Sequence, residues 1–148
     1  SDAVYLRNHP DGDPFEVRPV RTLEDAMLMG MGIGLYWGEG TKASKHSVRL
    51  GNTDPKLLSC FMEFLDRMFG VPKDDLHFSL QIFTDIDSSE ALDFWVGQLG
   101  VHKDQFYKPT VTISGSLGTY RKKSKYGVVT VDYGNSRLRD IIYNLLPS

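Results

Sequence analysis

The chain is expected to fold as an α+β domain with a mostly antiparallel sheet. Two observations predict this class. Four segments place apolar residues at helical spacing, four others alternate apolar with polar residues, and the two kinds are interleaved along the chain. The 148 residues are also 41% hydrophobic, which is enough for one compact core. We therefore expect a single domain, residues 22–148.

Residues 1–21 are expected to form an extended N-terminal arm. Pro10, Gly12, Pro14 and Pro19 stand there among charged residues, with no periodic apolar pattern.

Residues 22–40 are predicted to form the first helix. Thr22 is a suitable N-cap, and the carboxylates of Glu24 and Asp25 suit the positive end of the helix dipole. Gly40 is expected to end the helix in the left-handed conformation. Glycines inside the helix each cost about 0.5 to 1 kcal/mol relative to alanine, so something outside the helix must compensate.

Three of these glycines, Gly30, Gly34 and Gly38, recur every four residues and therefore lie on one helix face. Such a bare face lets a second helix backbone approach closely, and we expect it to be a dimer interface. The rest of the helix is apolar all round, as in a helix buried between its own domain and a partner. The apolar run is too short to span a membrane, which takes about 20 residues, so we expect no membrane association.

The remaining elements follow from alternation, caps and glycine stops. They are a strand at 47–52, a helix from the cap Asp54 to Gly70, a strand at 76–82, a helix from the cap Asp87 to Gly100, strands at 110–114 and 126–133, and a helix at 136–146.

Glu39 lies at the end of the first helix, where the dipole is already negative. Two interpretations are open. The carboxylate is either solvated at a helix end or a ligand for a bound cation.

The run of residues 32–40 resembles the LAGLIDADG motif of homing endonucleases and their relatives. Gly34, Leu35 and the acid-glycine ending Glu39-Gly40 match the motif, while Trp37 replaces its first aspartate. The resemblance implies a LAGLIDADG homing endonuclease-like fold, in which a saddle-shaped sheet lies in the DNA major groove with helices on its other face. Because the motif occurs once, it implies a homodimer whose motif helices pack face to face.

The resemblance also implies a metal site. Glu39 would bind Mg²⁺ or another divalent cation, the backbone carbonyl of Gly38 would be a second ligand, and a basic residue, Lys125 or Lys123, would polarise the attacking water. Glu39 and Lys125 are thus the expected catalytic residues.

The charge distribution favours a double-stranded DNA partner, although the net charge is only -2. Nine of the 17 basic residues lie in segments 41–49 and 103–125 with one acid, Asp104, whereas the rest of the chain carries eight basic residues and 18 acids. Such segregation can give one basic face. In the sheet that the resemblance implies, the outward strand residues would face DNA and could contact bases. The expected DNA-binding residues are Lys42, Lys45, Arg49, Ser79, Gln81, Arg121, Lys122, Lys123 and Lys125.

Three functions remain open. The first is a Mg²⁺-dependent, homodimeric, site-specific DNA endonuclease. The second is a non-cleaving DNA-binding transcription regulator that keeps the motif helix only for dimerisation. The third is a structural dimer without nucleic acid. Glu39 favours the first function, whereas the near-neutral charge and a hairpin after the motif that is far shorter than in homing endonucleases favour the second.

The cysteine and histidines indicate no further site. A single cysteine, Cys60, excludes an intramolecular disulfide and is expected to pack in the core. His46, His77 and His102 do not form a metal-ligand pattern. No secretory signal is visible, and we expect a cytoplasmic protein.

Overall fold

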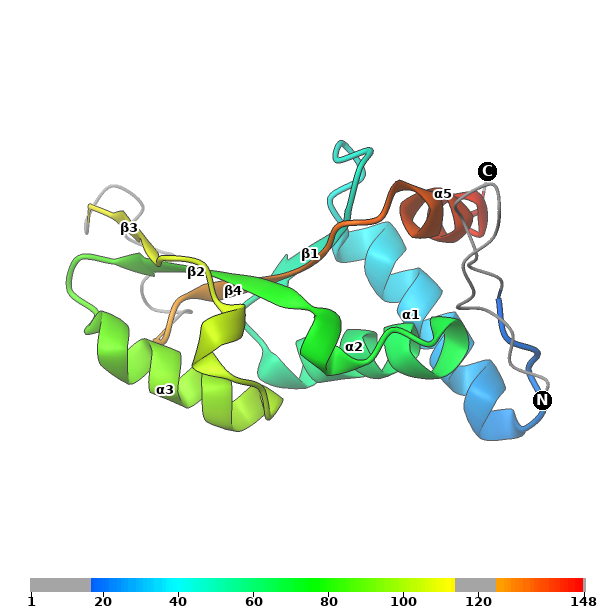
Figure 1. Ribbon diagram of the computed structural model, residues 1–148, viewed down its shortest axis with the longest axis horizontal. Helices are drawn as coiled ribbons and strands as arrows, with labels where there is room; N and C mark the ends of the chain where they lie inside the picture. Colours follow the sequence, from blue (N-terminus) through cyan, green and yellow to red (C-terminus); the bar gives the residue numbers. More distant parts are fainter. Residues whose placement is uncertain (1–16, 114–124, 148) are drawn as a thin grey trace.

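The computed structural model describes residues 17–113 and 125–147. Over these residues the protein is an α+β protein with four α-helices and a four-stranded mixed sheet, mostly antiparallel (Figure 1). In chain order the elements are α1 (Leu23–Glu39), β1 (Val48–Asn52), α2 (Pro55–Phe69), the 3₁₀ turn η1 (Lys73–Asp75), β2 (His77–Phe83), α3 (Ser88–Leu99), the 3₁₀ turn η2 (Lys103–Gln105), β3 (Thr110–Thr112), β4 (Val128–Tyr133) and α5 (Ser136–Asn144). The predicted order of helices and strands is confirmed.

The helix caps confirm most of the predicted boundaries. The Thr22 hydroxyl accepts a hydrogen bond from the Asp25 N–H at 3.0 Å, and the Asp87 carboxylate accepts from two N–H groups in the first turn of α3. Gly70 and Gly100 end α2 and α3 in the left-handed conformation, with φ of 71° and 66°.

Gly40 differs from its prediction. Its φ of -70° and ψ of 149° are extended rather than left-handed, so the expected left-handed stop was wrong. A glycine is nevertheless required there, because a Cβ at position 40 would overlap the ring and the carbonyl oxygen of Tyr36. The close approach lets Gly40 form a bridge with Leu50 of β1, and the Thr41 N–H donates to the Arg49 carbonyl at 2.9 Å. Among the described residues, these two contacts make up the short hairpin that was expected after the motif.

The sheet has the strand order β1-β4-β2-β3. β4 is antiparallel to both β1 and β2, and β2 is parallel to β3. Val131 of β4 lies opposite Leu50 on one side and Phe78 on the other, and all three side chains are buried. The residues that alternate with them along each strand point to the opposite face, which is mostly polar and carries Arg49, Ser79, Gln81, Thr130 and Asp132. The expected division into an apolar and a polar face is therefore confirmed.

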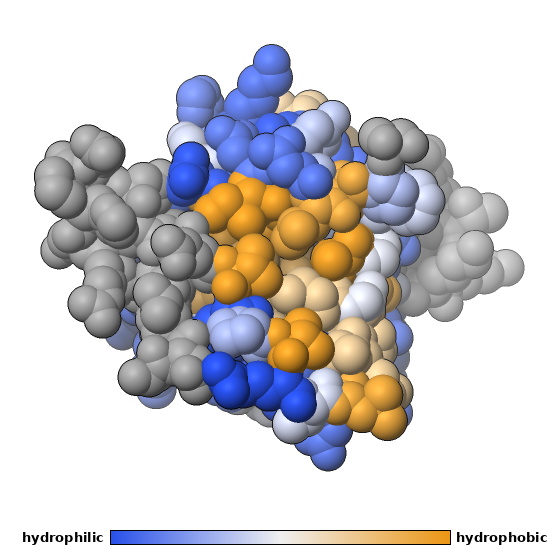
Figure 2. Space-filling view, turned by 90° about the vertical axis from the view of Figure 1, so that its right-hand side faces the viewer, coloured by the Kyte–Doolittle hydropathy of each residue, from blue (hydrophilic) through white to orange (hydrophobic). Residues whose placement is uncertain are grey.

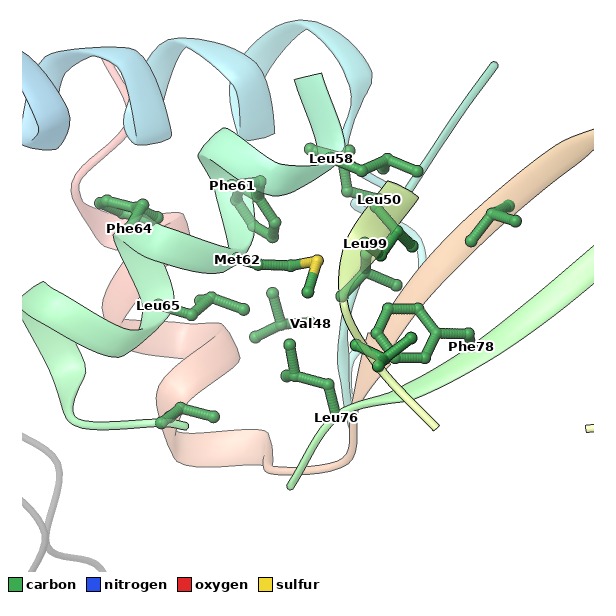
Figure 3. Packing of buried hydrophobic residues seen from close by; sticks show 14 of the residues in the cluster. Val48, Leu50, Leu58, Phe61, Met62, Phe64, Leu65, Leu76, Phe78 and Leu99 are labelled. Carbon is green, nitrogen blue, oxygen red and sulfur yellow. The ribbon is translucent and has the colours of Figure 1, made fainter. Parts of the chain in front are cut away.

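The core lies between the apolar face of the sheet and α2, with α3 continuing it (Figure 3). Figure 3 shows Met62 of α2 directed toward Val48 of β1, close to Leu99 of α3. α1 packs against α2. At this contact the ring of Phe64 occupies the space that a side chain at Gly32 would need. α1 therefore has one face fixed against its own domain.

The described part of the arm lies against the end of α2. The Arg18 N–H donates to the Met68 carbonyl at 2.9 Å, and its guanidinium donates to the Arg67 carbonyl at 3.1 Å. None of the helices in residues 17–113 and 125–147 is both long and apolar enough to cross a membrane.

Candidate nucleic-acid interface and acidic helix end

Glu39 is the last residue of α1, and its side chain is exposed. The Asn52 amide donates to its Oε1 at 3.4 Å, a long hydrogen bond. Asn52 is itself oriented by the start of α2, because its Oδ1 accepts from the Asp54 N–H at 2.9 Å. The carboxylate is thus placed by the β1–α2 connection, and Asn52 was not anticipated from the sequence.

Lys42 lies at the same helix end but contacts the backbone. Its ammonium donates to the Trp37 carbonyl at 2.7 Å and approaches the Tyr36 carbonyl at 3.4 Å. The Trp37 carbonyl is among the last four of α1, which have no partner within the helix, whereas the Tyr36 carbonyl also accepts from the Gly40 N–H at 2.9 Å. Lys42, predicted to contact DNA phosphates, is therefore engaged as a cap in this structure.

One protomer supplies few metal ligands. Among the described residues, no three His, Cys, Asp or Glu side chains are grouped so that they could hold a metal ion. Mg²⁺, however, usually keeps several waters and binds one or two carboxylates together with substrate phosphates. A single exposed carboxylate with a neighbouring carbonyl, that of Gly38, fits this pattern only if a second protomer and a phosphate complete the site.

The polar face of the sheet carries the expected base-reading side chains in register. Arg49 lies opposite Asp132, and Ser79 lies opposite Thr130. The amide of Gln81 donates to the Thr112 hydroxyl at 3.1 Å. Arg49, Ser79 and Gln81 are half-buried or exposed, so the structure brings these three residues onto one accessible face.

This face also carries Asp132, which was not anticipated from the sequence. Asp132 lies between Arg49 on β1 and His77 on β2, both of which are its direct cross-strand neighbours. The Arg49 Nε is 4.0 Å from the Asp132 Oδ1, which is an ion pair too long for a hydrogen bond. The His77 ring stacks on Tyr107 with centroids 5.6 Å apart. Strand alternation places Asp132 outward, and only the strand pairing reveals its neighbours.

The other predicted basic residues are dispersed. Lys45 is exposed in the loop after α1 and makes no hydrogen bond or ion pair with a described residue. Arg121, Lys122 and Lys123 lie outside the described residues. Lys125 is exposed, and its ammonium lies 5.3 Å from the centre of the Tyr126 ring.

Lys125 and Glu39 are not brought together within one protomer. Lys125 lines a hollow of about 310 Å³ with the acidic residues Asp85, Asp87 and Glu90, near the start of β4. The Glu39 carboxylate contacts Asn52 on β1, which pairs with Val129 of β4, whereas Lys125 lies in the turn before β4. No hydrogen bond or ion pair joins Lys125 to Glu39 among the residues that the structure describes. This placement does not support Lys125 as the residue that polarises water at Glu39.

The glycine face of α1 is open to solvent. Among the described residues, a Cβ built at Gly30, Gly34 or Gly38 would meet no atom within 4 Å. Large apolar side chains flank these glycines and are 52 to 77% exposed, namely Leu23, Met27, Met31 and Trp37. Figure 2 shows a continuous apolar area, bordered by hydrophilic residues, on the side of the molecule that carries α1 and α5.

Comparisons of the chain with protein-family models, with curated proteins and with solved structures find no match. The function of this protein is therefore inferred from its residues and their geometry.

Proposed function

We propose that the protein is a homodimeric, LAGLIDADG-like protein that binds double-stranded DNA, with α1 as its dimer interface. The observation that carries this proposal is the exposed apolar face of α1. Monomeric soluble proteins rarely leave a large contiguous apolar patch exposed, and such a patch commonly marks an interaction site.

The arrangement of residues on α1 favours another copy of the same helix as the partner. At about 100° per residue, Gly34 lies at the middle of the exposed face, with Met27 and Met31 on one side and Trp37 on the other. The bare glycine line admits a helix backbone, and the flanking side chains surround it. A two-fold axis makes one patch complementary to itself, as in most homodimers.

Such a dimer would bring the two α1 ends, and with them both copies of Glu39, to one side of the assembly. Two carboxylates beside a phosphate are ligands that suit Mg²⁺. When bound, the cation would activate water and stabilise the leaving oxygen in phosphodiester hydrolysis. In this reading Glu39 and the Gly38 carbonyl hold the cation, and the short Asn52 side chain orients the carboxylate.

The polar face of the sheet is the proposed DNA-binding surface. Arg49 and Gln81 have the donor geometry for bidentate contacts with guanine and adenine, and Ser79 can contact a base or a phosphate. Lys45 and the basic residues between 121 and 125 would neutralise phosphates without reading sequence.

A non-cleaving regulator is the second candidate, favoured by a specific observation. After α1 the chain forms only the Gly40–Leu50 bridge before β1, so the sheet gains little length for a long target site. The two candidates share the dimer and the DNA surface, and they differ in whether Glu39 acts in cleavage.

Incubation of the protein with a pooled random-site DNA library, with and without Mg²⁺, tests the proposal. Selected and cleaved sequences indicate the endonuclease, and selected but intact sequences indicate the regulator. If no sequence is enriched, DNA recognition is ruled out. The double variant Arg49→Ala/Gln81→Ala should lose the selection, whereas the control Lys56→Ala/Gln98→Ala, at exposed positions of α2 and α3, should keep it.

Glu39→Gln tests the metal site separately. It should abolish divalent-metal binding and any cleavage together, while DNA affinity without metal persists. The metal-free variant should keep its stability or gain at most about 1 kcal/mol, because a repulsion with the helix dipole is removed. A metal-induced rise in melting temperature that persists in Glu39→Gln would place the metal elsewhere.

A further inference from the structure

Two buried polar atoms face each other on the polar side of the sheet without a hydrogen bond. They are the Nε of Arg49 on β1 and the Oδ1 of Asp132 on β4, which lie 4.0 Å apart. Neither atom has a hydrogen-bond partner among the described residues. Buried donors and acceptors are usually paired, so a donor and an acceptor that are left unpaired beside each other need an explanation.

The surroundings of Asp132 leave Arg49 as the group that its carboxylate can hold. Asp132 pairs across the sheet with Arg49 on one side and with His77 on the other. The His77 ring stacks on Tyr107, and no hydrogen bond or ion pair joins His77 to Asp132 in the described part of the chain. A shift of roughly 1 Å in the arginine side chain would bring its Nε within hydrogen-bonding distance of the carboxylate.

Such a bond would use the inner donor of the guanidinium and leave the outer donors free. Arginine carries five N–H donors in a fixed fork, and its terminal nitrogens suit the O6 and N7 atoms of guanine. Among the described residues, no hydrogen bond or ion pair engages the terminal nitrogens of Arg49. The Arg49 side chain is 39% exposed and that of Asp132 is 20% exposed. The carboxylate is therefore the more shielded partner, and the fork of the arginine stays open to a ligand.

The second side chain expected to read bases has the same kind of support. Gln81 on β2 donates from its amide to the Thr112 hydroxyl on the adjacent strand β3, at 3.1 Å. Arg49 and Gln81 thus each lie beside a polar side chain on a neighbouring strand. In both cases the neighbour can fix the direction of the longer side chain before a ligand arrives.

Asp132 has an electrostatic cost on a surface that faces DNA. A carboxylate there repels phosphates and lowers the affinity for every sequence. An arginine that is already oriented loses less conformational freedom on binding, so its contact with the correct base is stronger. A gain in discrimination between sites is therefore the return that offsets the loss in general affinity.

We propose that Asp132 is a positioning residue that orients Arg49 toward a guanine of the DNA site and sets the specificity of the protein at that base pair. This inference rests on the proposed binding of DNA by the polar face of the sheet. Asp132 acts through Arg49 and does not itself contact a base. It also lowers the affinity for DNA of unrelated sequence.

The test selects sites from a pooled random-site duplex DNA library without added metal and then measures affinities for the selected duplex and its single-base-pair variants. Arg49→Ala identifies the base pair that Arg49 reads. Asp132→Ala should lower the discrimination at this same base pair by roughly tenfold. Asp132→Asn keeps an oxygen that can accept the bond and should lose no more than about threefold. Both Asp132 variants should bind unrelated DNA at least as tightly as the wild type.

Asp93→Ala is the matched control for the loss of one charge and one ion pair. Asp93 pairs with Lys103 at 2.9 Å, but it lies on α3, which covers the apolar face of the sheet, and the variant should keep the wild-type preferences. Arg49→Ala/Asp132→Ala should discriminate no worse than Arg49→Ala alone, because Asp132 acts only through Arg49. Thermal melting checks that each variant is folded, and Asp132→Val, which suits a strand, replaces Asp132→Ala if that variant is unfolded.

Other results separate the failure of this inference from the failure of the proposed function. If the wild type enriches no sequence, DNA recognition is wrong and the inference falls with it. If the wild type selects a site but Asp132→Ala keeps the preference that Arg49→Ala loses, the ion pair is only structural and the inference alone fails. It also fails if Arg49→Ala loses no preference, or if Asp132→Asn loses as much as Asp132→Ala. A loss at a different base pair in Asp132→Ala would show direct contact of Asp132 with a base, and an equal loss in Asp93→Ala would show an effect of net charge.

Discussion

The two faces of α1 use glycine for opposite reasons. Gly32 faces the domain, where the Phe64 ring fills the position of its missing side chain. Gly30, Gly34 and Gly38 face outward, and a Cβ at any of them would meet no atom of a described residue within 4 Å. The first glycine is therefore explained within the protomer. The other three lower helix propensity, and no contact in the described part of the protomer compensates for it. This difference is the strongest indication of a partner on the outer face.

The largest expected effect is on the packed face. Gly32→Ala would place a Cβ inside the Phe64 ring, and overpacking of this kind costs about 1 to 3 kcal/mol. We expect a loss near the upper end of that range in urea unfolding at fixed protein concentration, although alanine favours helix more than glycine does. In a Phe64→Leu background the same substitution should cost much less. Equal costs in both backgrounds would contradict the contact.

The second effect concerns the open face and association. Gly34→Leu should leave the protomer folded, because no described residue occupies the space beside Gly34, but it should separate two packed helix backbones. We expect the variant to sediment as a monomer at concentrations where the wild type is a dimer. Gly97→Leu in α3 is the control, since a Cβ there also meets no atom within 4 Å in the described part of the chain. A Gly34→Leu dimer of unchanged stability would exclude the glycine face as the interface.

The sequence predicted the local features of this helix and missed its contacts with residues that are distant in the sequence. The spacing of four distinguished Gly30, Gly34 and Gly38 from Gly32, and the caps placed the ends of α1, α2 and α3 within one or two residues. The conformation of Gly40 was missed because it depends on the Tyr36 ring and on pairing with β1. Periodicity reports which face of an element is apolar and carries no information on what packs against it.

The same limit applies to the candidate site. Glu39 was proposed from its position at a helix end together with the motif resemblance, whereas Asn52 was not anticipated, because its bond to Glu39 depends on the path of the β1–α2 connection. Lys42 was interpreted as one member of a basic segment. Its role as a cap depends on a loop held by Arg139, which lies 97 residues later in the chain and donates to the Lys42 carbonyl at 2.7 Å. The parallel pairing of β2 with β3 likewise follows from tertiary arrangement.

A smaller effect on association is expected from the side chains that flank the glycines. Met31→Lys places a charge on the proposed interface and removes apolar area, of which a fully buried methionine contributes about 1.5 to 3 kcal/mol. We expect a dimer dissociation constant raised by about tenfold in sedimentation, with unchanged protomer stability. Val111→Lys is a matched control, because Val111 is 53% exposed and Met31 is 52% exposed. Similar weakening in both variants would indicate a nonspecific effect of charge.

The smallest effect concerns the ion pair that ties the start of α1 to α2 on the packed side. The Arg67 guanidinium donates to the Asp25 carboxylate at 2.7 Å, and the Arg21 N–H donates to the other oxygen at 3.2 Å. The Arg21 hydrogen bond, with smaller contributions from Arg67 and Thr22, lowers the pKa of Asp25 below its ordinary value of 3.8, and partial burial opposes this. A carboxyl with a lowered pKa in the folded state adds stability above its ordinary pKa.

That contribution should disappear as the pH falls from about 3.8 through the lower pKa of the folded state. Asp25→Asn should therefore melt slightly below the wild type at pH 7, and the two melting curves should converge in acid. The loss should be small, because partly exposed ion pairs contribute little, and added salt should reduce it further. The dimer dissociation constant should not change, since Asp25 belongs to the packed face. A difference in melting temperature that is as large at pH 3 as at pH 7 would show that Asp25 acts through its shape and not through its charge.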